Sequence, residues 1–230
     1  MDEIRLINIK EQIFSKNTNL ANEIRERLEA RNVFLLNLMS SPGSGKTSLI
    51  VETIRRLRNK YSIGVIEGDI DSLVDSEKVA AEGVPAVQLR TGGSCHLDAP
   101  MVNAALETMN LDALDFVLVE NIGNLVCPAS FDTGAALKVM ILSVPEGDDK
   151  ILKYPLMFSM VDCLVVNKMD YLAHSNFNLE ILRERMQALN PTAEIIEVSC
   201  IKGEGLERWC NWLDSRIAAK FDRSLAGKTL

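Results

Sequence analysis

The sequence has neither a long apolar run nor an excess of positive charge. None of its hydrophobic segments approaches the roughly 20 residues that span a bilayer, and the charged N-terminal segment lacks the apolar core of a signal peptide. With 32 acidic residues against 25 basic ones, the net charge is −7, which disfavours a nucleic-acid partner. We therefore expect a cytoplasmic protein that binds neither membranes nor nucleic acid.

Cysteine and histidine are scarce, with five and two residues among 230, and no two cysteines form a C-x-x-C pair. An odd number of dispersed cysteines in a chain of this kind argues against a disulfide framework and favours metal binding or burial. Three cysteines fall within or beside expected core elements and are interpreted as structural: Cys163, Cys200 and Cys210. His174 is expected to be solvated.

Short apolar runs alternate with amphipathic segments of helical length along most of the chain. The first run, Val33 to Met39, precedes a helical segment at 47–60, and six further runs follow. This alternation predicts a doubly wound, mostly parallel α/β sheet, in which ligands bind in the loops at the carboxyl ends of the strands. We expect one domain over residues 33–230, with residues 1–32 forming a helical extension that packs on it.

The stretch GSGKTS directly follows the first expected strand and opens a helix, which is the setting of a phosphate-binding loop. Its glycines allow backbone N–H groups to turn toward phosphates, Lys46 supplies a positive charge, and the Thr47 hydroxyl is a ligand for Mg²⁺. Ser40 stands where the motif has its first glycine. The expected nucleotide-binding residues in this loop are Gly43, Ser44, Gly45, Lys46, Thr47 and Ser48.

Two later segments indicate that the nucleotide is a guanine nucleotide. In NKMD, the Asp170 carboxylate can accept two hydrogen bonds from guanine that adenine cannot donate, while Asn167 and Lys168 help to position the base. About thirty residues later, SCIKGEGL places Ser199 and Cys200 where GTPases have a loop that backs the guanine. The combination with the phosphate-binding loop indicates a GTPase and argues against a P-loop kinase.

Acidic residues at two other strand ends are candidates for Mg²⁺ binding and catalysis. Glu120, in ENIG, stands where most GTPases have an aspartate three residues before a glycine, and we expect it to hold Mg²⁺ through water. Asp69 and Asp75 are candidates for orienting the attacking water or completing the Mg²⁺ shell, whereas Asp71 can equally be a helix cap. The expected catalytic residues are Lys46, Asp69, Asp75 and Glu120, and the expected magnesium residues are Thr47, Asp69 and Glu120.

Cys95, His96 and Cys127 form a candidate site for a transition metal. Thiolate and imidazole are the ligands of Zn²⁺ or Ni²⁺ and not of Mg²⁺ or Ca²⁺. Both segments follow expected strands, so that the three side chains could converge at one edge of the sheet. From spacing alone, simple burial of the two cysteines remains an alternative.

Taken together, these residues resemble the HypB family of hydrogenase nickel-incorporation GTPases, most specifically in ENIGNLVCPASFD and LSVPEGDDKILKYPLMF. The resemblance extends from about Val33 to Leu213. It implies a P-loop GTPase of the nucleotide-dimerising (SIMIBI-type) class that acts as a GTP-hydrolysing metallochaperone, with Cys95, His96 and Cys127 binding Ni²⁺ or Zn²⁺. It also implies a homodimer favoured by GTP and metal, with Lys153 near the subunit contact. The implied partners are other hydrogenase maturation factors and the hydrogenase large subunit.

Some features depart from the family pattern. The first 94 residues contain neither cysteine nor histidine, so we expect neither the tight N-terminal nickel site nor the histidine-rich storage tract of other members. Pro100 replaces a histidine and Ser72 a threonine. Two alternatives stay open: a urease-type nickel-insertion GTPase, whose Cys-Pro-His motif is not found in CPA, and a nucleotide-gated scaffold with a structural metal.

Overall fold

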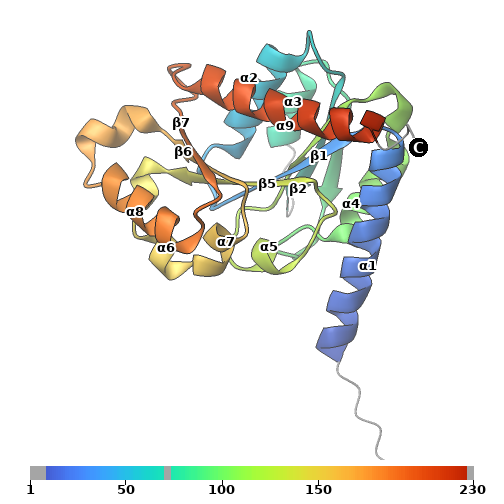
Figure 1. Ribbon diagram of the computed structural model, residues 1–230, viewed down its shortest axis with the longest axis horizontal. Helices are drawn as coiled ribbons and strands as arrows, with labels where there is room; N and C mark the ends of the chain where they lie inside the picture. Colours follow the sequence, from blue (N-terminus) through green and yellow to red (C-terminus); the bar gives the residue numbers. More distant parts are fainter. Residues whose placement is uncertain (1–8, 70–73, 227–230) are drawn as a thin grey trace, which may run out of the picture.

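Seven parallel strands form one sheet with helices on both faces (Figure 1). The computed structural model describes residues 9–69 and 74–226, and the side chains of residues 13–69 and 77–220. The strands are β1 (Phe34–Ser40), β2 (Ile63–Asp69), β3 (Ala86–Arg90), β4 (Phe116–Glu120), β5 (Leu137–Ser143), β6 (Cys163–Asn167) and β7 (Glu194–Glu197). Their order is β3-β2-β4-β1-β5-β6-β7. From β1 the chain runs to β2 and β3 at one edge, returns to β4 beside β1, and then continues through β5 and β6 to β7 at the other edge, which confirms the predicted doubly wound fold.

The helices that cover the sheet differ in length. Those of seven residues or more are α1 (Ile9–Ala30), α2 (Lys46–Leu57), α3 (Val74–Ala80), α4 (Ala99–Thr108), α8 (Leu179–Leu189) and α9 (Leu206–Ala226). Between β4 and β6 the helices are short: α5 (Cys127–Ser130), α6 (Lys150–Lys153) and α7 (Pro155–Ser159). Within the described residues, three 3₁₀ turns complete the elements: η1 (Leu111–Ala113), η2 (Val144–Glu146) and η3 (Met169–His174).

Alternating side chains of the strands supply the core on each face of the sheet. On β1, Leu36 and Leu38 join the hydrophobic cluster under α2 and α9, whereas Leu35 faces the cluster under α1 and α4. A third cluster packs beneath α7 and α8. The central strands are buried along their whole length, but β3 is half-exposed because it forms the edge of the sheet.

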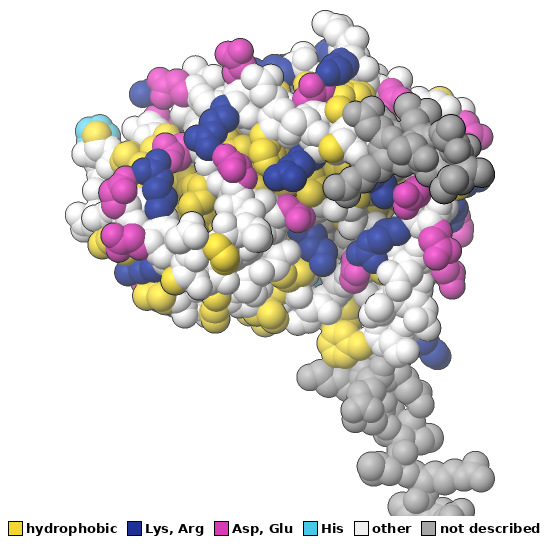
Figure 2. All heavy atoms as spheres, viewed as in Figure 1, with side chains coloured by type: hydrophobic (Ala, Val, Ile, Leu, Met, Phe, Trp, Pro, Cys, Tyr) yellow, Lys and Arg dark blue, Asp and Glu magenta, His cyan; other side chains and the backbone are white. Residues whose placement is uncertain are grey.

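The helix α1 lies against the sheet domain and runs beside α4 (Figure 1). Its residues Ala21, Ile24 and Leu28 are buried in the same cluster as Leu35 of β1. The helix α1 therefore shares a hydrophobic core with the sheet. A domain boundary at residue 33 stays a prediction. Among the described residues, none of the helices combines the length and hydropathy needed to span a bilayer. Acidic and basic side chains are interspersed over the face that Figure 2 shows.

Candidate functional site

The phosphate-binding loop joins β1 to α2, as expected from the sequence. Gly43 and Gly45 have φ angles of 75° and 100°, a region that L side chains rarely adopt. At Gly45 a Cβ would lie 2.3 Å from Asn167 Nδ2, so this position requires glycine. Lys46 Nζ donates to the buried Ser40 Oγ at 2.9 Å. The serine that replaces the first glycine of the motif therefore holds the ammonium group at the end of β1.

A hydroxyl and a carboxylate meet where β1 and β4 end side by side. Thr47 Oγ1 donates to Glu120 Oε1 at 3.0 Å, and both residues are buried. Oxygen ligands of these two kinds suit Mg²⁺. Asp69 ends the next strand, β2, and is half-buried. The side chain of Asp75 and all of Asp71 and Ser72 lie outside the described residues.

The NKMD segment is tied directly to the phosphate-binding loop. At the end of β6, Asn167 Nδ2 donates to the Ser44 carbonyl at 2.9 Å, and Lys168 Nζ donates to the Gly43 carbonyl at 2.7 Å. Asn167 Oδ1 also accepts from the Cys200 backbone N–H at 3.4 Å. One asparagine thus connects the phosphate loop with the loop expected to back the guanine.

The carboxylate expected to bind the base is oriented by a serine. Ser199 is fully buried, and its Oγ donates to Asp170 Oδ1 at 2.6 Å. A cavity of about 520 Å³ lies between α2, the C-terminal end of α3 and the loop of Cys200, and Thr47 is among its lining residues. Burial raises the pKa of the Cys200 thiol to about 11, so the thiol is neutral at physiological pH and is a poor nucleophile.

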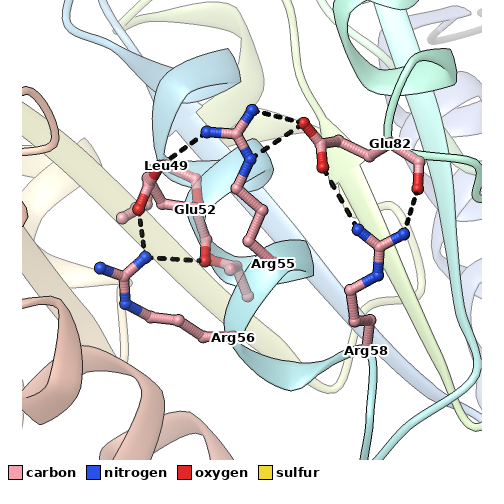
Figure 3. Close-up of polar contacts among 7 residues, drawn as sticks. Leu49, Glu52, Arg55, Arg56, Arg58 and Glu82 are labelled. Carbon is pink, nitrogen blue, oxygen red and sulfur yellow. Dashed lines mark hydrogen bonds and ion pairs between the residues drawn. The ribbon is translucent and has the colours of Figure 1, made fainter.

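An ion-pair network fastens α2 to the turn that follows α3 (Figure 3). Glu82 accepts from Arg55 Nη2 at 2.7 Å, and its backbone carbonyl accepts from Arg58 Nη2 at 2.8 Å. Arg55 and Arg56 also pair with Glu52 within α2. The network fixes the turn at the C-terminal end of α3.

The structure brings Cys95, His96 and Cys127 together, although 32 residues separate the two cysteines. The two Sγ atoms are 3.1 Å apart, and one ligand atom from each of the three residues lies within 4.8 Å of the others. His96 Nδ1 is buried without a hydrogen-bond partner, and burial lowers the pKa of the imidazole, which favours the neutral, ligating form. This donor set fits a Zn²⁺ or Ni²⁺ ion.

The metal-site loops are connected to the end of β4 by asparagines. Asn121, the residue after Glu120, accepts with Oδ1 from the Leu97 backbone N–H at 3.0 Å and donates with Nδ2 to Asn37 of β1 at 3.2 Å. Asn124 Nδ2 donates to the Cys95 carbonyl at 3.2 Å. Reasoning from the sequence missed Asn121 and Asn124. The signal for Asn121 was its partner Asn37, a polar residue inside the apolar run of β1.

Other residues singled out from the sequence lie apart from this cluster. The side chain of Lys153 in α6 is 59% exposed and forms an ion pair with Asp149 at 2.5 Å. A contact between Lys153 and a second subunit stays a prediction. Pro100 stands in the first turn of α4 behind the cap Asp98, a position that suits proline. Of the three cysteines expected to be structural, Cys163 and Cys210 are buried and Cys200 is half-buried.

Comparison with known proteins identifies the family to which this nucleotide-binding fold belongs. The family described as CobW/HypB/UreG, nucleotide-binding domain, matches residues 34–197. The hydrogenase maturation factor HypB of Escherichia coli K12 is 44% identical over 219 residues, which are 95% of this chain and 76% of that protein. The chain belongs to the HypB family. The hydrogenase/urease maturation factor HypB of Helicobacter pylori J99 is 41% identical over 211 residues, 90% of this chain and 86% of that one.

Solved HypB structures share the fold. Archaeoglobus fulgidus HypB matches with a TM-score of 0.83 at 37% identity, over 88% of this chain and 99% of that one. Helicobacter pylori HypB, solved in complex with nickel, matches with a TM-score of 0.84 at 39% identity, over 89% and 96%. The signal recognition particle receptor FtsY of Elizabethkingia anophelis, at 14% identity and a TM-score of 0.53, shares the fold alone. The predicted family and fold class are confirmed.

Proposed function

We propose that this HypB-family protein is a GTP-hydrolysing metallochaperone that carries nickel at Cys95, His96 and Cys127 and releases it during hydrogenase maturation. Support for nickel as the cargo comes from the donor set and from the Helicobacter pylori relative solved with nickel. Support for the process comes from relatives named hydrogenase maturation factors. The partners that we propose are other maturation factors and the hydrogenase large subunit.

In this proposal the phosphate loop, Mg²⁺ and the guanine-binding loops act as one nucleotide site. Lys46 binds the β- and γ-phosphates, and Thr47 and Glu120 hold Mg²⁺, which neutralises phosphate charge when bound. Asp170 selects guanine. Because phosphoryl transfer is catalysed mainly by positioning and charge neutralisation, we assign slow GTP hydrolysis to these groups. We further propose that Asp69 completes the Mg²⁺ environment and that Asp75 orients the attacking water.

The observation that carries the proposal is a short path of contacts from the nucleotide site to the metal site. Thr47 contacts Glu120, and the next residue, Asn121, accepts a hydrogen bond from the backbone of Leu97, adjacent to His96. A change at the γ-phosphate that shifts the end of β4 therefore also shifts the metal ligands. Since such coupling is reciprocal, metal must alter nucleotide affinity by the same factor.

The proposal includes a homodimer that GTP and metal favour, with Lys153 reaching the second subunit. The exposed position of Lys153 in α6 leaves its side chain accessible to a partner. Exchange of the ion pair with Asp149 for one across the interface would cost little, since exposed ion pairs contribute little to stability.

A nickel-binding measurement tests the cargo site. Equilibrium dialysis with Ni²⁺ is expected to give stoichiometric binding to the parent protein and to Cys210→Ala, a cysteine outside the cluster. Cys95→Ala and Cys127→Ala are expected to lose that binding while they keep GDP affinity. Full nickel binding by both variants would show that the cluster is not the cargo site. A metal that cannot be removed without unfolding the protein would instead support the structural-metal alternative.

A further inference from the structure

The two loops that carry the metal ligands are not placed next to each other by the sheet alone. The segment with Cys95 and His96 follows β3, and the segment with Cys127 follows β4, but β2 lies between these strands. Something other than strand pairing must therefore set the distance between the loops. One connection is Asn121, which follows Glu120 at the end of β4 and accepts a hydrogen bond from the Leu97 backbone N–H. A second connection comes from the N-terminal helix.

Asn17 of α1 bridges both ligand-bearing segments with a single side chain. Its Oδ1 accepts from the Ala99 backbone N–H at 2.9 Å, three residues after His96. Its Nδ2 donates to the Asp132 carbonyl at 2.9 Å, five residues after Cys127. Asn17 is only 5% exposed, so loss of either bond would leave a buried polar group unsatisfied.

Two further contacts reinforce this bridge. The ring of Phe131 is stacked between Phe14 of α1 and the imidazole of His96, with centroid separations of 5.0 Å and 3.9 Å. Arg25, two turns beyond Asn17, holds both carboxylate oxygens of Asp132 at 2.6 Å. The helix therefore contacts the imidazole through one intervening ring and fixes the segment after Cys127 at two points.

Asn17 also occupies a position where the helix pattern favours an apolar residue. The buried face of α1 carries Asn17, Ala21, Ile24 and Leu28 at spacings of three and four. A buried asparagine in an apolar stripe is costly unless both of its polar ends are bonded, as they are here. Its two partners are the backbones of the two ligand-bearing segments and of no other part of the chain that the structure describes.

We propose that α1 positions the metal site, with Asn17 and Phe131 as positioning residues that hold His96 and Cys127 at the separation needed to share one ion. The inference rests on the proposed metal site and goes beyond it, because it assigns a role in metal binding to a helix outside the nucleotide-binding fold. Neither residue is a ligand. Both act by placing the proposed ligands His96 and Cys127.

The test is a Co²⁺ titration of Asn17→Leu in the GDP-bound protein, followed by thiolate-to-metal charge-transfer absorption. Leucine has a similar volume but neither donor nor acceptor. We expect at least tenfold weaker Co²⁺ binding and altered d–d bands, which report ligand geometry, with GDP affinity unchanged. The matched control is Asn19→Leu, the same substitution at an exposed position of the same helix. It is expected to behave as the parent protein does.

Each outcome decides the inference. A loss of Co²⁺ affinity in Asn17→Leu of less than tenfold, or an equal loss in Asn19→Leu, would overturn it. Should Asn17→Leu fail to bind GDP, the same criteria apply to Phe131→Leu, which removes the stacked ring and leaves an apolar side chain. Failure of the proposed function looks different: the parent protein would give no thiolate band, or Cys127→Ala would keep it.

Discussion

Replacement of Asp170 by asparagine is expected to shift the base preference from guanine toward xanthine. In the structure the Ser199 hydroxyl donates to Asp170 Oδ1 at 2.6 Å, which orients the carboxylate. In Asp170→Asn the same hydroxyl can donate to the amide oxygen, so that the amide NH₂ is presented to the base. Guanine then meets a donor with its own two donors, whereas the 2-carbonyl of xanthine can accept.

The expected size of the effect follows from the bonds lost. Hydrogen bonds to a charged group contribute about 1.5–3 kcal/mol each, and water recovers part of the loss, which leaves about 2–4 kcal/mol for the pair. Affinity for GTP should therefore fall roughly 30- to 700-fold. Competition titration with GTP and xanthosine triphosphate measures both preferences, and Asp112→Asn, on the exposed surface, removes equal charge as a control. GTP affinity unchanged in Asp170→Asn would refute the assignment of this carboxylate.

Three further predictions concern hydrolysis, assembly and stability. Lys46→Ala is expected to abolish measurable GTP turnover, and parent-like phosphate release would show that the loop does not bind phosphate in this way. Light scattering should detect a dimer with a GTP analogue but not with GDP, and Lys153→Ala should remain monomeric in both states. Asp132→Asn should lower the free energy of unfolding by about 1–2 kcal/mol at neutral pH, measured by urea denaturation. Burial raises the pKa of Asp132, but the hydrogen bonds from Arg25 and the Gly134 backbone prevail and hold it below its ordinary value. The difference between the two proteins should therefore persist above about pH 4, the ordinary pKa of aspartate, and be lost as pH falls through the lower pKa of the folded parent protein.

The sequence was sufficient to predict the sheet and the place of the site within it. Apolar runs such as Val33 to Met39 are buried on both sides, which is typical of a central parallel strand, and GSGKTS has few other structural settings. The rule that ligand-binding loops gather at the carboxyl ends of strands made convergence of Cys95 and Cys127 possible, and the family resemblance assigned them as ligands; the structure brings the two together. These predictions depend on local patterns, and local patterns are visible in a sequence.

The remaining features depend on contacts between distant segments. The partners of Asn17 are 82 and 115 residues away, and no periodicity specifies which backbone groups will meet a buried amide. The stacking of Phe131 on His96 likewise depends on how the loop after β4 folds. The short helices α5, α6 and α7 were not apparent from the sequence, because elements of four or five residues have no measurable period.

The coupling between nucleotide and metal is decided by one titration: Ni²⁺ affinity of the protein bound to GDP and bound to a non-hydrolysable GTP analogue. The contacts from Thr47 through Glu120 and Asn121 to the loop of His96 predict that nickel affinity differs between the two states. The proposed release of nickel on hydrolysis requires the tighter binding to be in the GTP-analogue state. A difference of about 5- to 150-fold is expected for a coupling of typical size. Equal nickel affinity in the two states would contradict a nucleotide-controlled release of the metal.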